Sequence, residues 1–372
     1  MKVGVIAAEM EGQTTGVGRY LEGLLSGLEQ WDHGVEWHLF FQGDSSQSLR
    51  LPEDDFHAHF SNHHGSRVLW EQILVSRDLK TVAPDVVFGP AYTLPFGLPA
   101  PAVVTIHDLS FEALPDDFGP RERWRRRLLA RRAARVSRRV ITDTGHLASL
   151  VEVGYRLASD RISIVPLGID SVRFSPRTGA DDRRVLRELD LNGPFILMPG
   201  TVFDRRLPRQ VLGAFAKVRR DRPELRLVIA GANRLRQQEQ LLAWVAEMDL
   251  ESSVRHLGWV KETSLAPLYR AAELGVYVSR HEGYGLPPME CLACGTPVVV
   301  SSGLGLDDAW PDYPYRVSEL SAESIATVMA EILGDETRTA QVVAQAGPII
   351  SGLGWEQSSR RLVTALSKAL SP

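Results

Sequence analysis

The sequence predicts an α/β fold with two doubly wound, Rossmann-like domains. Short apolar runs of strand length alternate with amphipathic helical stretches in two successive series, which is typical of parallel sheets covered by helices. The chain has 372 residues, whereas a single hydrophobic core rarely grows beyond about 250 to 300 residues. We therefore expect two sheets that face each other across a central cleft.

The first series predicts an N-terminal domain of residues 1–170. Its apolar runs are continuous, as in strands buried on both faces, and they lie at 2–8, 35–41, 85–89, 102–107, 140–144 and 162–169. Helices are expected at 16–30, 121–139 and 145–154. Residues 42–66 are polar, and we expect this segment to be irregular.

The second series predicts a C-terminal domain of residues 194–354, after a charged linker at 171–193. Strands are expected at 195–201, 225–231, 254–260, 274–279 and 297–302. A helix is expected after each of the first four strands, and another at 321–333. A final helical segment covers 355–372.

The segment that joins the last two strands carries the densest chemistry. Gly283 and Gly285 let the backbone approach a ligand closely, and free amides at the start of the following helix favour anions. Glu282 precedes this helix and Glu290 lies on it. Two solvent-exposed carboxylates are the alternative. The functional interpretation is favoured because glycines, helix start and both carboxylates belong to one βαβ unit.

This segment resembles the signature of the retaining glycosyltransferases of family 4, which have the GT-B fold. In the signature, seven residues separate two glutamates, and the helix ends in Ala-Cys-Gly-x-Pro-Val. Glu282, Glu290 and residues 293–298 match it. The resemblance covers nearly the whole chain, and it implies that the C-terminal helix at 355–372 packs back on the N-terminal domain. It implies transfer of a sugar from a nucleoside-diphosphate sugar, of the GDP-mannose or UDP-hexose type, to an acceptor hydroxyl with retention of configuration.

The resemblance also implies roles for individual residues. His107, in a matching Thr-Ile-His-Asp-Leu, would lie beside the donor sugar and acceptor; a packed core histidine is the alternative. Glu282 would orient the sugar, and Glu290 would accept hydrogen bonds from the ribose. The expected catalytic residues are His107, Glu282, Arg205 and Arg206. The expected donor-binding residues are Gly16, Gly18, Thr201, Gly283, Tyr284, Gly285, Leu286, Glu290 and Val260.

Arg205 and Arg206 follow the first strand of the second domain. Guanidinium groups match phosphate oxygens, so this pair can neutralise a leaving diphosphate; a solvated surface pair is the alternative. Many family members have a lysine at the position of Arg206, which keeps the charge but changes the geometry. The resemblance favours front-face attack, in which the leaving phosphate accepts the acceptor's proton. Double displacement through a carboxylate nucleophile stays open.

No metal and no cofactor other than the sugar nucleotide is expected. The sequence has no Asp-x-Asp pair. His57, His59, His63 and His64 cluster in the segment 42–66, but we expect no rigid element there to fix ligand geometry. A loop near the acceptor is favoured instead. The two cysteines, Cys291 and Cys294, are expected to be packed thiols rather than a redox or metal site.

Composition limits the partners and the location. The net charge of -4 gives no general attraction to nucleic acid. Neither a signal peptide nor an apolar run of about 20 residues is evident, so a cytoplasmic protein is expected. Residues 121–139 hold ten arginines and one glutamate. Either this segment is a solvated helix packed on the sheet, or it contacts an anionic membrane surface or a phosphorylated acceptor.

Two other functions stay open at this point. A sugar-nucleotide epimerase can have the same architecture but needs no acceptor. A non-catalytic, two-lobed ligand-binding protein is the other alternative, and donor hydrolysis without acceptor would argue against it. The acceptor can be a glycan, a lipid-linked sugar or a small aglycone.

Overall fold

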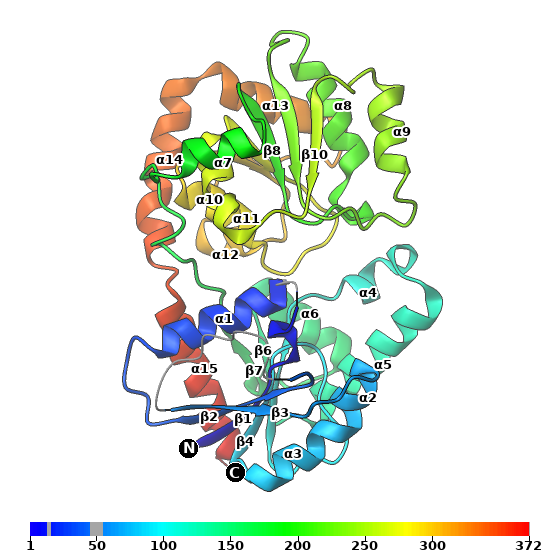
Figure 1. Ribbon diagram of the computed structural model, residues 1–372, viewed down its shortest axis with the longest axis vertical. Helices are drawn as coiled ribbons and strands as arrows, with labels where there is room; N and C mark the ends of the chain where they lie inside the picture. The colour runs from blue at the N-terminus through cyan, green and yellow to red at the C-terminus, as the bar shows by residue number, and fades with distance from the viewer. Residues whose placement is uncertain (13–15, 45–54, 372) are drawn as a thin grey trace. The chain divides into compact units, whose positions relative to one another are not determined.

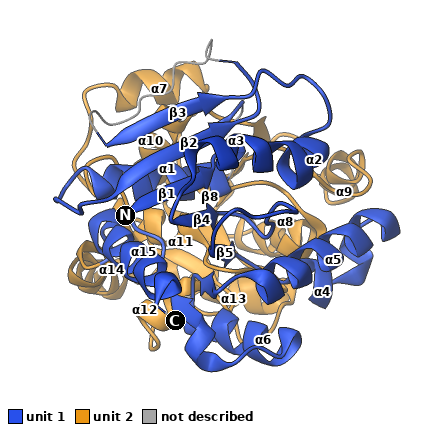
Figure 2. Cartoon of the chain, turned by 90° about the horizontal axis from the view of Figure 1, so that it is seen from below, with its two compact units in different colours: residues 1–168, 353–372 blue, residues 169–352 orange. Residues whose placement is uncertain are grey.

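The computed structural model describes residues 1–12, 16–44 and 55–371. The chain forms two compact units, which Figure 2 shows in different colours. Unit 1 contains residues 1–168 and 353–372, and unit 2 contains residues 169–352. Each unit has one parallel sheet with helices on both faces, so the predicted α/β class is confirmed. The expected cleft between two domains stays a prediction.

Unit 1 is built on a seven-stranded parallel sheet with the order β3-β2-β1-β4-β5-β6-β7. The strands are β1 (Lys2–Ile6), β2 (Glu36–Phe41), β3 (Phe56–Phe60), β4 (Val86–Gly89), β5 (Ala102–Ile106), β6 (Arg139–Thr142) and β7 (Ile162–Ile164). Chain order reverses between β1 and β4, and such a reversal leaves a crevice at the strand carboxyl ends.

Helices cover both faces of this sheet (Figure 1). One face carries α1 (Gly16–Leu28) and α15 (Trp355–Leu370). The other face carries α3 (Val75–Val82), α5 (Pro120–Val136) and α6 (Gly145–Tyr155), whose apolar residues share a core with Phe40 and Trp70. The short elements are α2 (Arg67–Leu69), a π-turn at Trp70–Leu74, α4 (Ser110–Ala113), and 3₁₀ turns at Ala8–Met10, Pro115–Asp117 and Ser159–Arg161.

The C-terminal helix α15 packs closely along α1. A Cβ atom at Gly23 would lie 2.2 Å from the ring of Trp355, and one at Gly27 would lie 2.2 Å from the Trp355 carbonyl oxygen. A Cβ atom at Gly168 would lie 2.5 Å from the Trp355 amide nitrogen. These glycines allow the last helix to join the fold of the first 168 residues.

Unit 2 is built on a five-stranded parallel sheet with the order β10-β9-β8-β11-β12. The strands are β8 (Phe195–Pro199), β9 (Arg226–Ala230), β10 (Val254–Gly258), β11 (Leu274–Tyr277) and β12 (Val298–Val300). Here the chain order reverses between β8 and β11. The carboxyl ends of these two strands are therefore the expected ligand position in unit 2.

The helices of unit 2 form two layers (Figure 1). In one layer α8 (Pro208–Val218) packs against α9 (Gln240–Glu247) and α13 (Ala322–Gly334). In the other, α10 (Glu262–Ala271) packs against α7 (Asp182–Glu188) and α11 (Leu286–Ala293). The remaining elements are α12 (Gly305–Ala309), α14 (Glu336–Ser351) and the 3₁₀ turn Asp204–Arg206.

Two sequence predictions differ from the structure. Residues 42–66 are not irregular throughout, because 56–60 form the edge strand β3; residues 45–54 of that segment lie outside the described residues. The expected linker 171–193 belongs to unit 2 and contains α7. This segment is held in place by Asp182, whose two carboxylate oxygens each accept a 2.7 Å hydrogen bond from Arg270 of α10.

Candidate functional site

Charged side chains gather in unit 2 where β8 and β11 end. Arg205 and Arg206 lie on the 3₁₀ turn that follows β8, and Glu282 lies in the loop that follows β11. The structure thus brings together three of the four residues predicted to be catalytic. Because this is the point where the chain order of the sheet reverses, the cluster occupies the position expected for a ligand of an open α/β sheet.

Arg206 is the centre of this cluster. Its Nε donates to Glu282 Oε1 at 3.0 Å, its Nη1 donates to the Thr201 carbonyl oxygen at 3.1 Å, and its Nη2 donates to the Tyr277 hydroxyl. Burial by itself would lower the pKa of Arg206, but Tyr277 and Glu282 outweigh it and raise this pKa. The guanidinium therefore stays charged although its side chain is only 11% exposed.

Arg205 completes the cluster from the other side of Glu282. Its guanidinium lies over the ring of Phe203 at 4.1 Å, and its Nε is 3.4 Å from Glu282 Oε1. Arg205 Nε is buried and has no hydrogen-bond partner among the described residues. Two guanidinium groups share one carboxylate, so the cluster has a net positive charge, and a free buried donor suits an anionic oxygen.

Glycines let the backbone make room for Arg206. Gly200 has a φ of +89°, and a Cβ atom there would lie 2.4 Å from Arg206 Nη1. A Cβ atom at Gly231 would lie 2.1 Å from the Gly200 carbonyl oxygen, a distance that atoms cannot adopt without movement. The sequence after β8 therefore folds back across the strand end only because both positions lack side chains.

The loop between β11 and α11 supplies backbone amides next to Glu282. Gly285 caps α11 with a φ of +78°, and prolines occupy the first turn of this helix, where a missing amide hydrogen costs nothing. Gly283, Tyr284 and Leu286 are buried. The Tyr284 ring packs tightly on Gly305, and a Cβ atom at Gly305 would lie 2.4 Å from this ring. This packing fixes the loop that the sequence predicts to hold the sugar.

Glu290 is buried on α11, with an exposed fraction of 1%. Its Oε2 accepts a 2.7 Å hydrogen bond from the Tyr269 hydroxyl of α10. The predicted contact with ribose hydroxyls stays a prediction, because it would require a ligand to reach this enclosed carboxylate.

The other predicted donor-binding residues lie at the ends of elements. Val260 follows β10 beside Trp259, whose side chain is 49% exposed. In unit 1, Gly16 and Gly18 are at the start of α1, after residues 13–15, which lie outside the described residues. Gly16 is exposed and Gly18 is buried.

His107 follows β5 in unit 1 and makes internal contacts with both ring nitrogens. Nδ1 lies 2.8 Å from Asp143 Oδ2, and Nε2 lies 2.7 Å from the Pro90 carbonyl oxygen. The ring of Tyr20 meets His107 edge-on, with 4.6 Å between the ring centres. Since a carbonyl oxygen accepts only, Nε2 must carry a proton. A direct catalytic role for His107 stays a prediction, and the geometry also allows an orienting role.

The pKa values of His107 and Asp143 describe a buried pair. Burial by itself would lower the pKa of His107, but the charge and hydrogen bond of Asp143, helped by Pro90, raise it. Burial raises the pKa of Asp143, although His107 opposes this shift. With Asp143 ionised, both His107 nitrogens donate and the ring is an imidazolium.

Sequence reasoning missed three partners of the predicted site residues. Tyr277 was part of an apolar strand, Tyr269 was part of an amphipathic helix, and Asp143 ended another strand. Of these, Asp143 had a usable signal, since a carboxylate at a strand carboxyl end faces the same crevice as His107. The tyrosines were indistinguishable from core aromatics.

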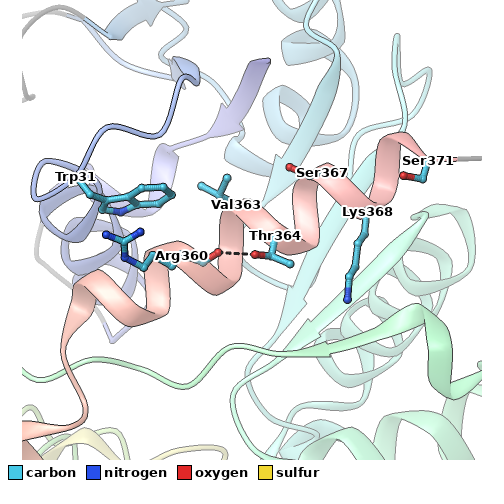
Figure 3. Close-up of a pocket in the computed structure, with 7 residues that line it drawn as sticks. All are labelled: Trp31, Arg360, Val363, Thr364, Ser367, Lys368 and Ser371. Carbon is cyan, nitrogen blue, oxygen red and sulfur yellow. Dashed lines mark hydrogen bonds between the residues drawn. The ribbon is translucent and has the colours of Figure 1, made fainter.

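A separate surface groove lies along α15. Figure 3 shows its lining, which is Trp31, Arg360, Val363, Thr364, Ser367, Lys368 and Ser371. The Arg360 guanidinium lies over the Trp31 ring at 4.2 Å. The groove contains none of the residues at the strand carboxyl ends, so we do not assign the reaction to it.

The fold and the strand-end cluster define a two-unit Rossmann-like protein with two arginines paired to one glutamate at the strand ends of unit 2. Two family models match this chain. The one described as "Glycosyltransferase Family 4" matches residues 14–173, and the one described as "Glycosyl transferases group 1" matches residues 181–348. The chain therefore belongs to the family 4-like glycosyltransferases with the GT-B fold, as the sequence motifs predict.

Individual relatives agree with this assignment. The chain is 30% identical to a D-inositol 3-phosphate glycosyltransferase of Frankia alni over 63% of this chain and 60% of that protein. It is 27% identical to an O-antigen chain mannosyltransferase B of Escherichia coli over 94% of this chain and 95% of that protein. Its fold is similar to that of HepE of Anabaena in complex with UDP-glucose, with a TM-score of 0.78 and 16% identity over 99% of this chain and 100% of that chain.

Proposed function

We propose that this protein transfers a hexose from a nucleoside-diphosphate sugar to an acceptor hydroxyl with retention of configuration. The pairing of Arg205 and Arg206 with Glu282 at the reversal point of the unit 2 sheet carries the proposal. Unit 2 would hold the donor and unit 1 the acceptor. The mannosyltransferase relative and the UDP-glucose complex of HepE support a donor of the GDP-mannose or UDP-hexose type.

The charge of the cluster suits the bond that breaks. Breaking the anomeric bond leaves negative charge on the diphosphate, and donors fixed in advance stabilise that charge best. Arg206 is fixed by Thr201, Tyr277 and Glu282, and Arg205 Nε is a buried donor that forms no hydrogen bond among the described residues. Of the residues at the start of α11, Leu286 can add an amide donor, whereas Pro287 and Pro288 have no amide hydrogen. These groups can perform the neutralisation that a metal ion performs elsewhere, so we propose transfer without a metal.

For the stereochemical course we propose front-face attack. The acceptor oxygen attacks the anomeric carbon from the side that the diphosphate leaves, and the leaving phosphate oxygen takes the acceptor's proton. Glu282 would be the nucleophile in double displacement, but its Oε1 is engaged by Arg206 and lies 3.2 Å from Ser279 Oγ. Isolation of a covalent glycosyl-enzyme adduct would overturn front-face attack.

Product analysis tests the proposed function. Purified protein is incubated with UDP-glucose or GDP-mannose and a set of sugar, lipid-linked and aglycone acceptors, and the anomeric configuration of the product is read by NMR. We expect an acceptor-dependent product with the donor's configuration. An epimerised donor formed without acceptor would support the epimerase alternative, which the family match does not favour.

The helix α5 supports a proposal about location. Three large apolar residues of this helix are exposed: Trp124, Leu128 and Val136 have exposed fractions of 67%, 51% and 47%. Ala130, Ala133 and Ala134 form the packed face instead. The exposed Trp124 and Leu128 share their face with arginines, because residues four or seven apart on a helix are neighbours.

This exposed face continues onto neighbouring segments. The Arg132 guanidinium lies over the ring of Phe96 at 3.8 Å, and Phe96 is itself 50% exposed. The Phe96 amide donates to the Gln72 carbonyl oxygen, next to Ile73, which is also 50% exposed. Exposed apolar residues with arginines around them suit the boundary between lipid tails and anionic headgroups. No helix among the described residues could span a bilayer.

We propose that α5 docks the protein on an anionic membrane from the cytoplasmic side. Sedimentation with phosphatidylglycerol vesicles at low salt tests this. The wild type should sediment, the double variant Trp124→Ala with Leu128→Ala should sediment much less, and the control Leu242→Ala, which removes a 70% exposed residue of α9, should match the wild type. Absence of wild-type sedimentation at low salt would remove the proposal and leave a solvated helix.

A further inference from the structure

Two neighbouring strands at the edge of the unit 1 sheet present metal-binding side chains on one face. Glu36 and His38 lie on β2, and His57 and His59 lie on the edge strand β3. In the parallel register His38 pairs with His57. Because side chains alternate between faces along a strand, all four point to the same side. Strand β3 is therefore the rigid element that was not expected from the sequence in this segment.

The ligand atoms of three of these residues converge. Those of Glu36, His38 and His57 all lie within 4.8 Å of one another. Glu36 Oε1 is 2.8 Å from His38 Nε2 and 3.5 Å from His57 Nε2. In a tetrahedral zinc site with bonds of about 2.1 Å, ligand atoms are roughly 3.4 Å apart. Side-chain movements of about 1 to 1.5 Å would bring the ligand atoms of Glu36, His38 and His57 to that spacing.

His59 supplies the outer partner that a histidine ligand needs. His38 Nδ1 lies 2.8 Å from His59 Nε2. Without a metal, His59 can donate to His38 Nδ1 while His38 Nε2 donates to Glu36. With a metal on His38 Nε2, the His38 ring takes its other tautomer and its Nδ1 donates to His59. Such a second hydrogen bond orients a ligating imidazole and raises its basicity.

The exposure of the cluster suits an ion that enters from solvent. His38 is buried, with 9% of its side chain exposed, whereas the side chains of Glu36 and His57 are 44% and 45% exposed. Lys2 of β1 pairs with Glu36 in the sheet, and its positive charge reduces the affinity for a cation.

We infer that Glu36, His38 and His57 bind one divalent transition-metal ion, with His59 as the hydrogen-bond partner of His38. Two imidazoles and a carboxylate suit zinc, and the fourth position is left to water. The site lies at the amino-terminal end of β2, whereas His107 follows the carboxyl end of β5. Its role is to tie the edge strand to the sheet, which goes beyond the proposed transfer reaction.

Zinc titration of the full-length, tag-free protein tests the inference. The protein is stripped with EDTA, dialysed and titrated with ZnCl₂ by calorimetry, and thermal unfolding is measured with and without zinc. His57→Ala removes an exposed ligand from β3. His64→Ala is the matched control, because this exposed histidine follows in the same segment but lies outside the cluster.

We expect one zinc per wild-type chain and a higher midpoint of thermal unfolding with zinc. His64→Ala should behave like the wild type, and His57→Ala should lose at least tenfold in affinity together with the thermal shift. His59→Ala should lose about 10-fold to 100-fold, as for other outer partners. Absence of one-to-one binding in the wild type, or equal binding by His57→Ala and His64→Ala, would overturn the inference. UDP and GDP binding should be the same in all variants, which separates this test from that of the proposed function.

Discussion

The carboxyl ends of the strands differ between unit 2 and unit 1 in the ratio of positively to negatively charged side chains. In unit 2 two arginines share the single carboxylate of Glu282, and the buried Arg205 Nε forms no hydrogen bond among the described residues. In unit 1 His107 pairs with Asp143, its second nitrogen is satisfied by Pro90, and Asp108 adds a further negative charge nearby. A region with surplus positive charge can bind an anion, whereas a paired region resists change. We therefore propose that the strand ends bind the donor in unit 2 and orient His107 in unit 1.

The largest expected effect comes from removing the shared carboxylate of unit 2. Glu282→Ala should lower kcat/KM for donor turnover by roughly 10² to 10³, as expected when one positioned transition-state contact is lost. Steady-state kinetics with the identified donor measures this loss. Arg209→Ala is the control, because it removes an exposed arginine of α8 whose 2.6 Å ion pair is with Glu247 of α9 rather than with Glu282. Wild-type rates for Glu282→Ala would remove the assigned role.

A smaller effect is expected in the paired region of unit 1. The pKa of His107 is raised in the folded chain, so the native state binds more protons than the unfolded state above pH 6.5. The free energy of unfolding should therefore fall as the pH rises from about 6.5 through the folded pKa of His107. The raised pKa of Asp143 acts in the same direction at lower pH.

Asp143→Asn tests this dependence. The variant loses the charged partner of His107, so its free energy of unfolding should fall by about 1 to 2 kcal/mol at neutral pH. Because the new amide can donate to a neutral His107, the variant should no longer lose stability on the alkaline side. Urea unfolding at pH 6, 7.5 and 9 measures both. A wild type whose stability rises across this range would contradict the paired-region account.

The smallest effect is expected at the enclosed glutamate of unit 2. Tyr269→Phe removes the hydrogen bond to Glu290 Oε2 and should cost about 1 kcal/mol of stability. If Glu290 also contacts the ribose, the KM for the donor should change a few-fold while kcat stays the same. A large fall in kcat would show that Tyr269 and Glu290 act at the reacting centre instead.

The sequence was sufficient for the overall fold because strand runs, glycine loops and helix periodicity are local signals. Both parallel sheets and the grouping of Arg205, Arg206 and Glu282 agree with the prediction. Strand β3 was missed since its residues, Phe56 to Phe60, alternate histidine with apolar residues in a polar segment. Helix α7 was missed because its pairing with Arg270 is 88 residues distant in the sequence.

The hydrogen-bond partners of buried polar side chains could not be predicted from the sequence. Whether Glu290 points to solvent or to Tyr269, and whether His107 has free nitrogens, depends on elements brought together by folding. The exposure of Trp124 could not be predicted either, because the small residues Ala130, Ala133 and Ala134 allow α5 to pack by its other face. Helical periodicity alone favours the larger apolar residues for burial.

Calorimetric titration with UDP and GDP tests the central claim most directly, since surplus positive charge at Arg205 and Arg206 should bind the diphosphate itself. The account predicts that at least one of these nucleotides binds the wild type and the Arg209→Ala control equally. It also predicts at least 100-fold weaker binding by the double variant Arg205→Ala with Arg206→Ala, provided that thermal unfolding shows this variant to be folded. Equal affinity of the folded double variant and the wild type, or no binding of either nucleotide by the wild type, would contradict it.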